Sequence, residues 1–160
     1  MKTYRSSSSE ETKKFGEKLA REILRARTGA SSRVGTRASR NGALVLALRG
    51  DLGAGKTTFV QGFFYGLGLK KRAPSPTFVI MRRHAIRSKK FANVFHLDLY
   101  RLKKASDLRV LGFKEILADP RNIILIEWAE RARRVLPKTT IWLRFGHGKK
   151  ENERHIMIKR

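Results

Sequence analysis

The sequence has 160 residues, with 37 lysines and arginines against 13 aspartates and glutamates, which gives a formal net charge of +24. Hydrophobic residues make up 41% of the chain, and cysteine is absent. The apolar content excludes a disordered chain, and the missing cysteine excludes disulfide and thiolate chemistry. A chain of this length can bury a real core, so we expect residues 1–160 to form a single domain.

The N-terminal segment lacks the apolar stretch of a signal peptide, and no apolar run is long enough to span a membrane. We therefore expect a cytoplasmic protein with no membrane partner. The charge favours contact with an anionic polymer such as RNA, with a basic patch at residues 82–90. Solvated lysines and arginines without any such role would give the same charge, so composition leaves both explanations open.

One amphipathic helix is predicted near the N-terminus, between two flexible segments. Residues 1–8 are expected to form a disordered tail. The segment from Ser8 to Glu11 has capping-box spacing, and apolar residues then recur at helical intervals, so we predict a helix over residues 9–25. Residues 26–42 are rich in Thr, Gly, Ser, Ala and Arg, which is typical of a flexible basic connector.

The rest of the chain alternates between predicted strands and helices. The uninterrupted apolar runs at residues 43–48 and 123–126 are typical of strands buried on both faces. Further strands are predicted at 78–81 and 91–100, joined as a hairpin by a basic turn at 82–90, and at 139–145 and 155–158. Helical patterns cover 59–67, 104–117 and 129–136.

The segment Gly50–Thr57 fits the pattern G-x-x-x-x-G-K-[ST] of a phosphate-binding loop, and it lies between a predicted strand and a predicted helix. Its glycines let successive backbone N–H groups point inward, where they can hold phosphate oxygens. Lys56 would reach the β- and γ-phosphates, and the Thr57 hydroxyl would bind Mg²⁺. The other candidate nucleotide-binding residues here are Asp51, Leu52, Gly53, Ala54, Gly55 and Thr58. We predict an α/β, P-loop NTPase-like three-layer fold, whose mixed and mainly parallel central sheet carries a hairpin insertion.

Two acidic residues directly end predicted buried strands. Glu127 follows residues 123–126, and Asp98 follows residues 94–97. One could hold Mg²⁺ and the other could orient or deprotonate the attacking water, and the sequence alone does not assign the two roles. The structural alternatives are a salt bridge from Asp98 to Arg101 and a strand-end cap at Glu127.

Two further segments of the sequence bear on the same site. Two prolines flank Ser75 and stiffen the segment that presents Thr77, which predicts either a sensor of γ-phosphate or metal, or a simple proline turn. His96 is predicted to lie on the strand face opposite Asp98, and no histidine has metal-ligand spacing. We therefore assign no metal to histidine.

Several motifs together resemble the TsaE (YjeE) family of bacterial P-loop ATPases in tRNA threonylcarbamoyladenosine biosynthesis. They occur in the family's order and cover most of residues 9–137: Ser9-Glu10-Glu11-Thr12, the Gly50–Thr58 loop, Ser75-Pro76-Thr77-Phe78, His96-Leu97-Asp98-Leu99-Tyr100-Arg101, Leu111-Gly112 and Ile126-Glu127-Trp128. The chain departs from the pattern in its long connector, in Ala129 after the Glu-Trp pair and in its extreme charge.

The resemblance implies a Mg²⁺-dependent ATPase that is slow alone. It would act with TsaD and TsaB counterparts to form threonylcarbamoyladenosine at adenosine 37 of tRNAs that read codons beginning with A, and it would meet tRNA indirectly or through its basic patches. Carried over by motif, Thr57 and Glu127 would bind Mg²⁺, while Lys56, Asp98 and a switch-like Thr77 would serve catalysis. Thr12, Trp128 and Arg154 would lie beside the nucleotide.

Three alternatives remain from the residues alone. A small-molecule kinase would use the same loop with an acceptor pocket and an arginine-bearing lid. A GTPase is disfavoured, because no N-K-x-D segment is present. A basic RNA-binding module would explain the charge and would leave the phosphate loop, Asp98 and Glu127 unexplained.

Overall fold

The computed structural model describes residues 2–26, 42–69, 80–102 and 104–159. The strands are β1 (Lys2–Ser6), β2 (Leu44–Arg49), β3 (Met81–Ala85), β4 (Asn93–Asp98), β5 (Asn122–Glu127), β6 (Ile141–His147) and β7 (Arg154–Lys159). The α-helices are α1 (Ser9–Arg25), α2 (Lys56–Gly66) and α3 (Phe113–Ala118), and the 3₁₀ helices are η1 (Ala105–Leu111) and η2 (Ala129–Val135). The predicted connector at 26–42 lies almost entirely outside these ranges, as does the segment that holds Thr77.

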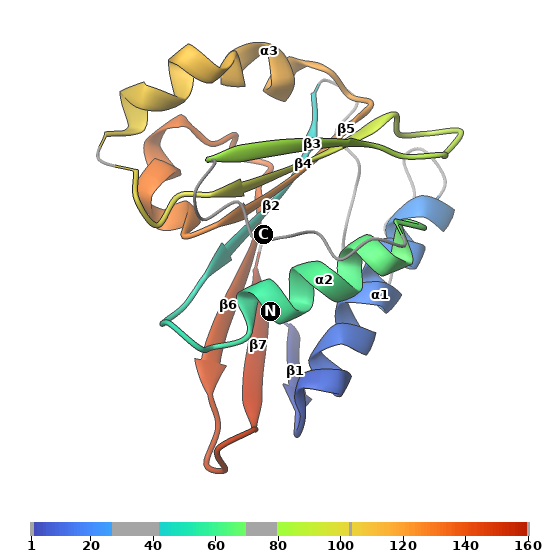
Figure 1. Cartoon of the computed structure of the whole chain (residues 1–160), viewed down its shortest axis with the longest axis vertical. Helices are drawn as coiled ribbons and strands as arrows, with labels where there is room; N and C mark the ends of the chain where they lie inside the picture. Colours follow the sequence, from blue (N-terminus) through green and yellow to red (C-terminus); the bar gives the residue numbers. More distant parts are fainter. Residues whose placement is uncertain (1, 27–41, 70–79, 103, 160) are drawn as a thin grey trace.

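The strands form one seven-stranded sheet in the order β1-β7-β6-β2-β5-β4-β3 (Figure 1). The four central strands β6, β2, β5 and β4 are parallel, and antiparallel pairs extend the sheet at both edges. The mixed α/β sheet is therefore confirmed, and the hairpin of β3 and β4 lies at one edge. Because β2, β4 and β5 are parallel neighbours, their carboxyl ends meet at the same edge of the sheet.

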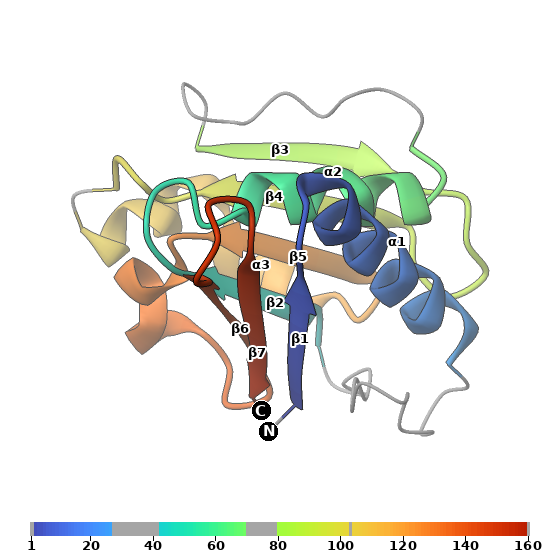
Figure 2. The same ribbon diagram turned by 90° about the horizontal axis from the view of Figure 1, so that it is seen from below.

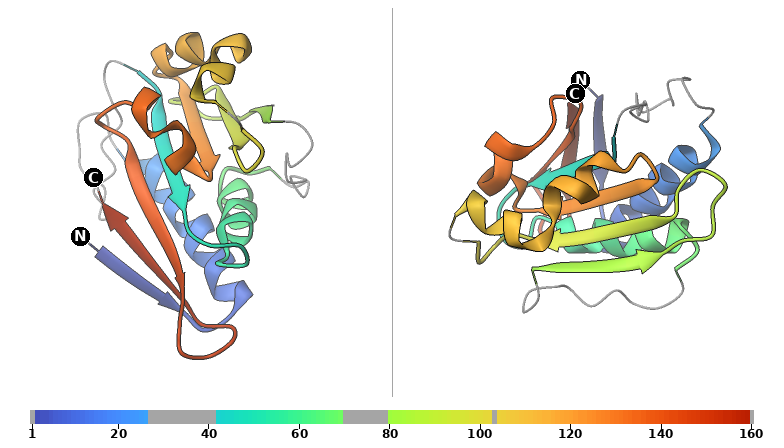
Figure 3. Two further views of the ribbon diagram at one scale, coloured as in Figure 1. Left: turned by 90° about the vertical axis from the view of Figure 1, so that its left-hand side faces the viewer. Right: turned by 90° about the horizontal axis from the view of Figure 1, so that it is seen from above.

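Helices cover both faces of the sheet, which gives the predicted three layers (Figure 2, Figure 3). Alternate residues of the buried strands enter two separate apolar cores. Leu46 and Leu48 of β2 pack with α1 and α2, whereas Val45 and Ala47 pack with η1, η2 and α3. The uninterrupted apolar run that the sequence showed is thus explained by burial on both faces.

The packing of α1 against α2 depends on close backbone approach. Ser8 caps α1 by accepting a hydrogen bond from the Glu11 amide at 3.2 Å, as the capping-box spacing predicted. A methyl group added at Gly62 of α2 would collide with the backbone of Lys13, and one at Gly16 of α1 would collide with the backbone of Phe59. Glycine at these positions lets the two helices lie close enough to fix α2, and with it the loop that precedes α2.

The structure corrects two predictions about the edges of the sheet. The expected disordered tail at residues 1–8 instead contains β1, which pairs antiparallel with β7 from Lys2 to Ser6. The basic turn was expected over residues 82–90. Arg82 and Arg83 instead lie within β3 and pair with β4, so the strand extends further than predicted and the turn starts later. Edge strands commonly carry charged residues, so the apolar pattern misses this one.

No helix in the described part of the chain combines the length and the apolar character that a membrane crossing requires.

Candidate functional site

The phosphate-binding loop connects the end of β2 to the start of α2. Gly50, Gly53 and Gly55 have φ angles of 144°, 74° and 95°, values that non-glycine residues rarely adopt. A methyl group at Gly50 would also collide with the backbone carbonyl of Phe145 in β6. The motif's glycines are therefore required here by backbone conformation and by the close approach of β6.

Lys56 is the first residue of α2 and is 5% exposed. Its Nζ donates hydrogen bonds to the carbonyl oxygens of Gly50 at 2.6 Å and Asp51 at 2.8 Å, and lies 3.9 Å from the centroid of the Trp128 ring. Burial lowers the pKa of the Lys56 ammonium, while nearby carboxylates, of which Glu127 acts most strongly, oppose that shift. The ammonium is thus held at the loop, facing the acidic residues.

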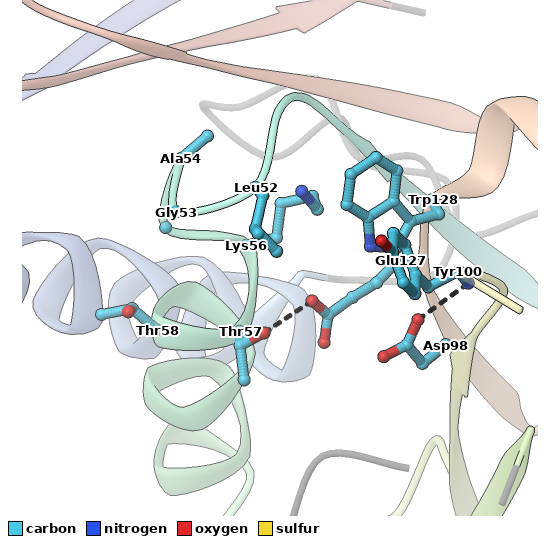
Figure 4. Close-up of a pocket in the computed structure, with 11 residues that line it drawn as sticks. Leu52, Gly53, Ala54, Lys56, Thr57, Thr58, Asp98, Tyr100, Glu127 and Trp128 are labelled. Carbon is cyan, nitrogen blue, oxygen red and sulfur yellow. Dashed lines mark hydrogen bonds between the residues drawn. The ribbon is translucent and has the colours of Figure 1, made fainter. Parts of the chain in front are cut away.

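The two candidate acids lie side by side at the carboxyl ends of β4 and β5. Asp98 and Glu127 are direct partners in the parallel register of these strands, and both side chains are buried. The Thr57 hydroxyl donates to Glu127 Oε2 at 2.7 Å, and Asp98 Oδ1 accepts from the Tyr100 amide at 3.0 Å (Figure 4). Both acids therefore face the start of α2, as the strand ends predicted.

His96 was missed by the sequence interpretation, which placed it on the face opposite Asp98. Residues two apart in a strand share a face, so the prediction was wrong. His96 is 1% exposed, and its Nε2 lies 2.9 Å from Glu127 Oε1. Glu127 therefore has one carboxylate oxygen on Thr57 and the other on His96, which fixes its orientation.

We expect the variant His96→Leu to lower the ATP turnover number about 10- to 100-fold with little change in ATP affinity, because Glu127 loses the partner that orients it. His96→Gln, which keeps a polar donor, should recover much of the loss. Steady-state kinetics of both variants, with thermal melting as a control for folding, test this role. Equal loss in the two variants would indicate a packing role for His96 instead.

Aromatic residues form one wall of the site. Trp128 has a φ of 56°, and its ring lies 5.1 Å from that of Tyr100, with 53° between the planes. Tyr100 had no role in the sequence interpretation, although it follows Asp98 by two residues. A wall of this kind can contact a flat base or exclude water from phosphates.

Together these elements enclose a pocket of about 360 Å³ (Figure 4). Its lining consists of Leu52, Gly53, Ala54, Gly55, Lys56, Thr57, Thr58, Asp98, Tyr100, Glu127 and Trp128. Most of the predicted site residues are therefore brought together in one place. Asp51 is exposed and enters the site through its carbonyl oxygen.

Thr12 and Arg154 lie beside the loop without lining this pocket. A methyl group at Gly55 would come within 3.6 Å of Thr12 Cγ2 and 3.8 Å of Arg154 Cγ. The Arg154 Nε donates to the Gly53 carbonyl at 3.2 Å, and the Thr12 hydroxyl is hydrogen-bonded to Ser6 at 2.7 Å. Both residues thus lie near the loop, and their place beside the nucleotide stays a prediction.

The donor set at Thr57 and Glu127 fits Mg²⁺. Neighbouring oxygen ligands of an octahedral magnesium ion lie about 2.9 Å apart, and the two oxygens here are separated by 2.7 Å. The described residues contain no group of three or more His, Asp or Glu side chains that could hold a metal by themselves. Nucleotide enzymes use magnesium sites of this kind, in which one carboxylate and one hydroxyl bind the ion and phosphate oxygens and water complete its coordination.

A strand, a glycine loop with lysine and threonine, a following helix and acids on neighbouring parallel strands define a P-loop nucleotide-binding protein. A family model described as threonylcarbamoyl adenosine biosynthesis protein TsaE matches residues 6–156. The chain therefore belongs to the TsaE family.

Individual relatives agree with this assignment. The chain is 33% identical over 128 residues to a tRNA threonylcarbamoyladenosine biosynthesis protein TsaE of Haemophilus influenzae, covering 80% of this chain and 71% of the relative. It is 39% identical over 94 residues to the TsaE of Bacillus subtilis, covering 59% of this chain and 56% of that relative. The crystal structure of Bacillus subtilis YdiB superposes with a TM-score of 0.67 at 28% identity, covering 98% of this chain and 83% of that one.

Proposed function

We propose that this chain is a Mg²⁺-dependent ATPase that acts in the cytoplasm, with TsaD and TsaB counterparts, in forming threonylcarbamoyladenosine at position 37 of tRNAs that read codons beginning with A. Membership of the TsaE family and the printed names of the relatives support the pathway. One observation carries the ATPase proposal most directly: the Thr57 hydroxyl, at the phosphate loop, and the Glu127 carboxylate are 2.7 Å apart.

The phosphate loop supplies the binding step. Its backbone N–H groups and the N-terminal end of α2 attract the phosphates, and Lys56 adds a full positive charge near the β- and γ-phosphates. Thr57 and Glu127 would hold Mg²⁺, which on binding would neutralise phosphate charge. Trp128 and Tyr100 cover one side, so water has less access to the reacting phosphate.

Asp98 is the residue that we propose for the hydrolytic step. Its Oδ1 accepts a backbone hydrogen bond from Tyr100, which orients the carboxylate in the pocket beside Glu127. A carboxylate so placed can orient or deprotonate the attacking water. Thr77, which lies outside the described residues, stays a predicted switch residue, and Thr12 and Arg154 stay predicted neighbours of the nucleotide.

The proposed function is tested by reconstituting threonylcarbamoyladenosine formation on an unmodified tRNA with purified TsaD and TsaB counterparts. Product should depend on this chain and should be lost with its Lys56→Ala variant. ATP turnover by the chain alone should be slow, because a competent state that needs partners is little populated without them. Product formation that is independent of the chain, together with tight ATP binding, would instead favour a small-molecule kinase.

A further inference from the structure

A second pocket, of about 500 Å³, lies on the sheet face that carries η2. Ile141, Leu143 and Phe145 of β6 enter the core beneath α1 and α2, so the alternate residues of β6 point to the opposite face. The lining includes five cationic side chains and one indole, those of Arg49, Arg133, Lys138, Arg144, Lys159 and Trp142. None of these six lines the nucleotide pocket.

The strand register places these cations together at a cost in stability. Arg49 of β2 lies directly opposite Arg144 of β6, and Lys159 of β7 lies opposite Trp142. Like charges directly opposite each other on a sheet are destabilising. Among the described residues, none of the five cations has a carboxylate within 4.0 Å, and Glu130 is the one acid in the lining. A bound anion would remove this repulsion.

The pocket also offers groups that recognise more than charge. Trp142 is partly exposed, and the guanidinium of Arg133 lies 5.9 Å from the centroid of its ring. Thr140 belongs to the same lining, and its buried hydroxyl has no hydrogen-bond partner in the described part of the chain. A flat indole among cations suits a ligand that carries both phosphates and an aromatic base.

We propose that this pocket binds single-stranded RNA, with backbone phosphates on Arg49, Arg144 and Lys159 and an unpaired base stacked on Trp142. A single strand is favoured over a duplex, because the bases of an RNA helix are not available for stacking on a side chain. The net charge of +24 attracts the polyanion at long range. This site goes beyond the ATPase activity, and each proposal can fail without the other.

The test measures binding of a fluorescently labelled single-stranded RNA oligonucleotide to the full chain by anisotropy, over a range of salt concentrations. The double variant Arg144→Ser/Lys159→Ser should weaken binding and reduce the slope of log affinity against log salt by about 1.4, since two phosphate contacts are lost. The matched control Lys14→Ser/Lys18→Ser removes two exposed charges from α1, on the other face, and should leave the slope close to that of the wild type.

Variants of Trp142 distinguish the contribution of base stacking to RNA binding from the contribution of charge. Trp142→Ala should weaken binding by about 5- to 150-fold, the loss of one base stack, whereas Trp142→Phe should retain most of the affinity. RNA should quench the tryptophan fluorescence of a Trp128→Phe variant and should not quench that of Trp142→Phe. Thermal melting of every variant, and ATP binding of the variants that leave the nucleotide pocket unchanged, confirm that the proteins are folded.

Three results would overturn the proposal. The α1 control could weaken binding as much as the pocket variants, which would indicate diffuse attraction to the whole surface. A duplex of the same sequence could bind as tightly as the single strand, with no effect of Trp142→Ala. The wild-type protein could show no binding to RNA at physiological salt and bind polyglutamate instead, which would indicate an acidic protein partner.

Discussion

Lys56→Ala is expected to weaken ATP binding about 100-fold or more, which abolishes it at ordinary nucleotide concentrations. Lys56 supplies the buried cation of the phosphate loop, held by the carbonyl oxygens of Gly50 and Asp51. Truncating one partner of a buried, hydrogen-bonded charge pair costs about 2–5 kcal/mol, most of which would appear as lost nucleotide affinity. Titration calorimetry with ATP and Mg²⁺ measures the effect directly.

The control for this experiment is Lys18→Ala, which removes an exposed lysine from α1 and the same unit of charge. It should bind ATP as the wild type does. Thermal melting separates a loss of binding from a loss of folding, since Lys56→Ala also leaves two loop carbonyls without their ammonium donor. Normal affinity in a folded Lys56→Ala variant would contradict the assignment of this loop as the nucleotide site.

Glu127→Gln is expected to reduce ATP hydrolysis about 100- to 1,000-fold while the protein stays folded and still binds nucleotide. The amide has nearly the shape of the carboxylate and can still accept the Thr57 hydroxyl hydrogen bond, so the buried network is largely kept. The negative charge is lost, and with it the affinity of this position for Mg²⁺. Single-turnover hydrolysis at increasing Mg²⁺ concentration should show a raised magnesium requirement.

Glu130→Gln is the matched control, since it removes an exposed carboxylate three residues later, at the start of η2. Its hydrolysis rate should stay near that of the wild type. Asp98→Asn belongs to the same series, and we expect slow hydrolysis with an unchanged magnesium requirement, because Asp98 is proposed to act on water. Wild-type turnover in both Glu127→Gln and Asp98→Asn would contradict the roles proposed for these two acids.

Local features were predictable because they depend on residues close together in the chain. The phosphate loop needs glycine at three positive φ angles and a lysine at the start of a helix, and these requirements appear as a short motif. The capping of α1 by Ser8 also depends on residues within one turn of a helix. The buried strands at β2 and β5 were visible as unbroken apolar runs, since both of their faces meet a core.

The edges of the sheet were less predictable, because pairing with a distant strand decides them. The strand β1 exists through its partner β7, more than 140 residues later in the chain, and nothing in the polar sequence of residues 2–6 requires a strand. The start of β3 is likewise set by its register against β4, which places Arg82 and Arg83 in a strand instead of a turn. Edge strands carry few apolar residues, so hydrophobic patterns detect them poorly.

The sequence by itself determined that this chain has a P-loop motif, that Asp98 and Glu127 each end a buried strand, and that it resembles the TsaE family. Only the tertiary structure decided that His96 holds Glu127 and that five cations gather around Trp142. The physical reason is distance along the chain. A motif encodes contacts within a few residues, whereas these clusters arise where the pairing of strands far apart in the chain brings together side chains from β2, β4, β5, β6 and β7.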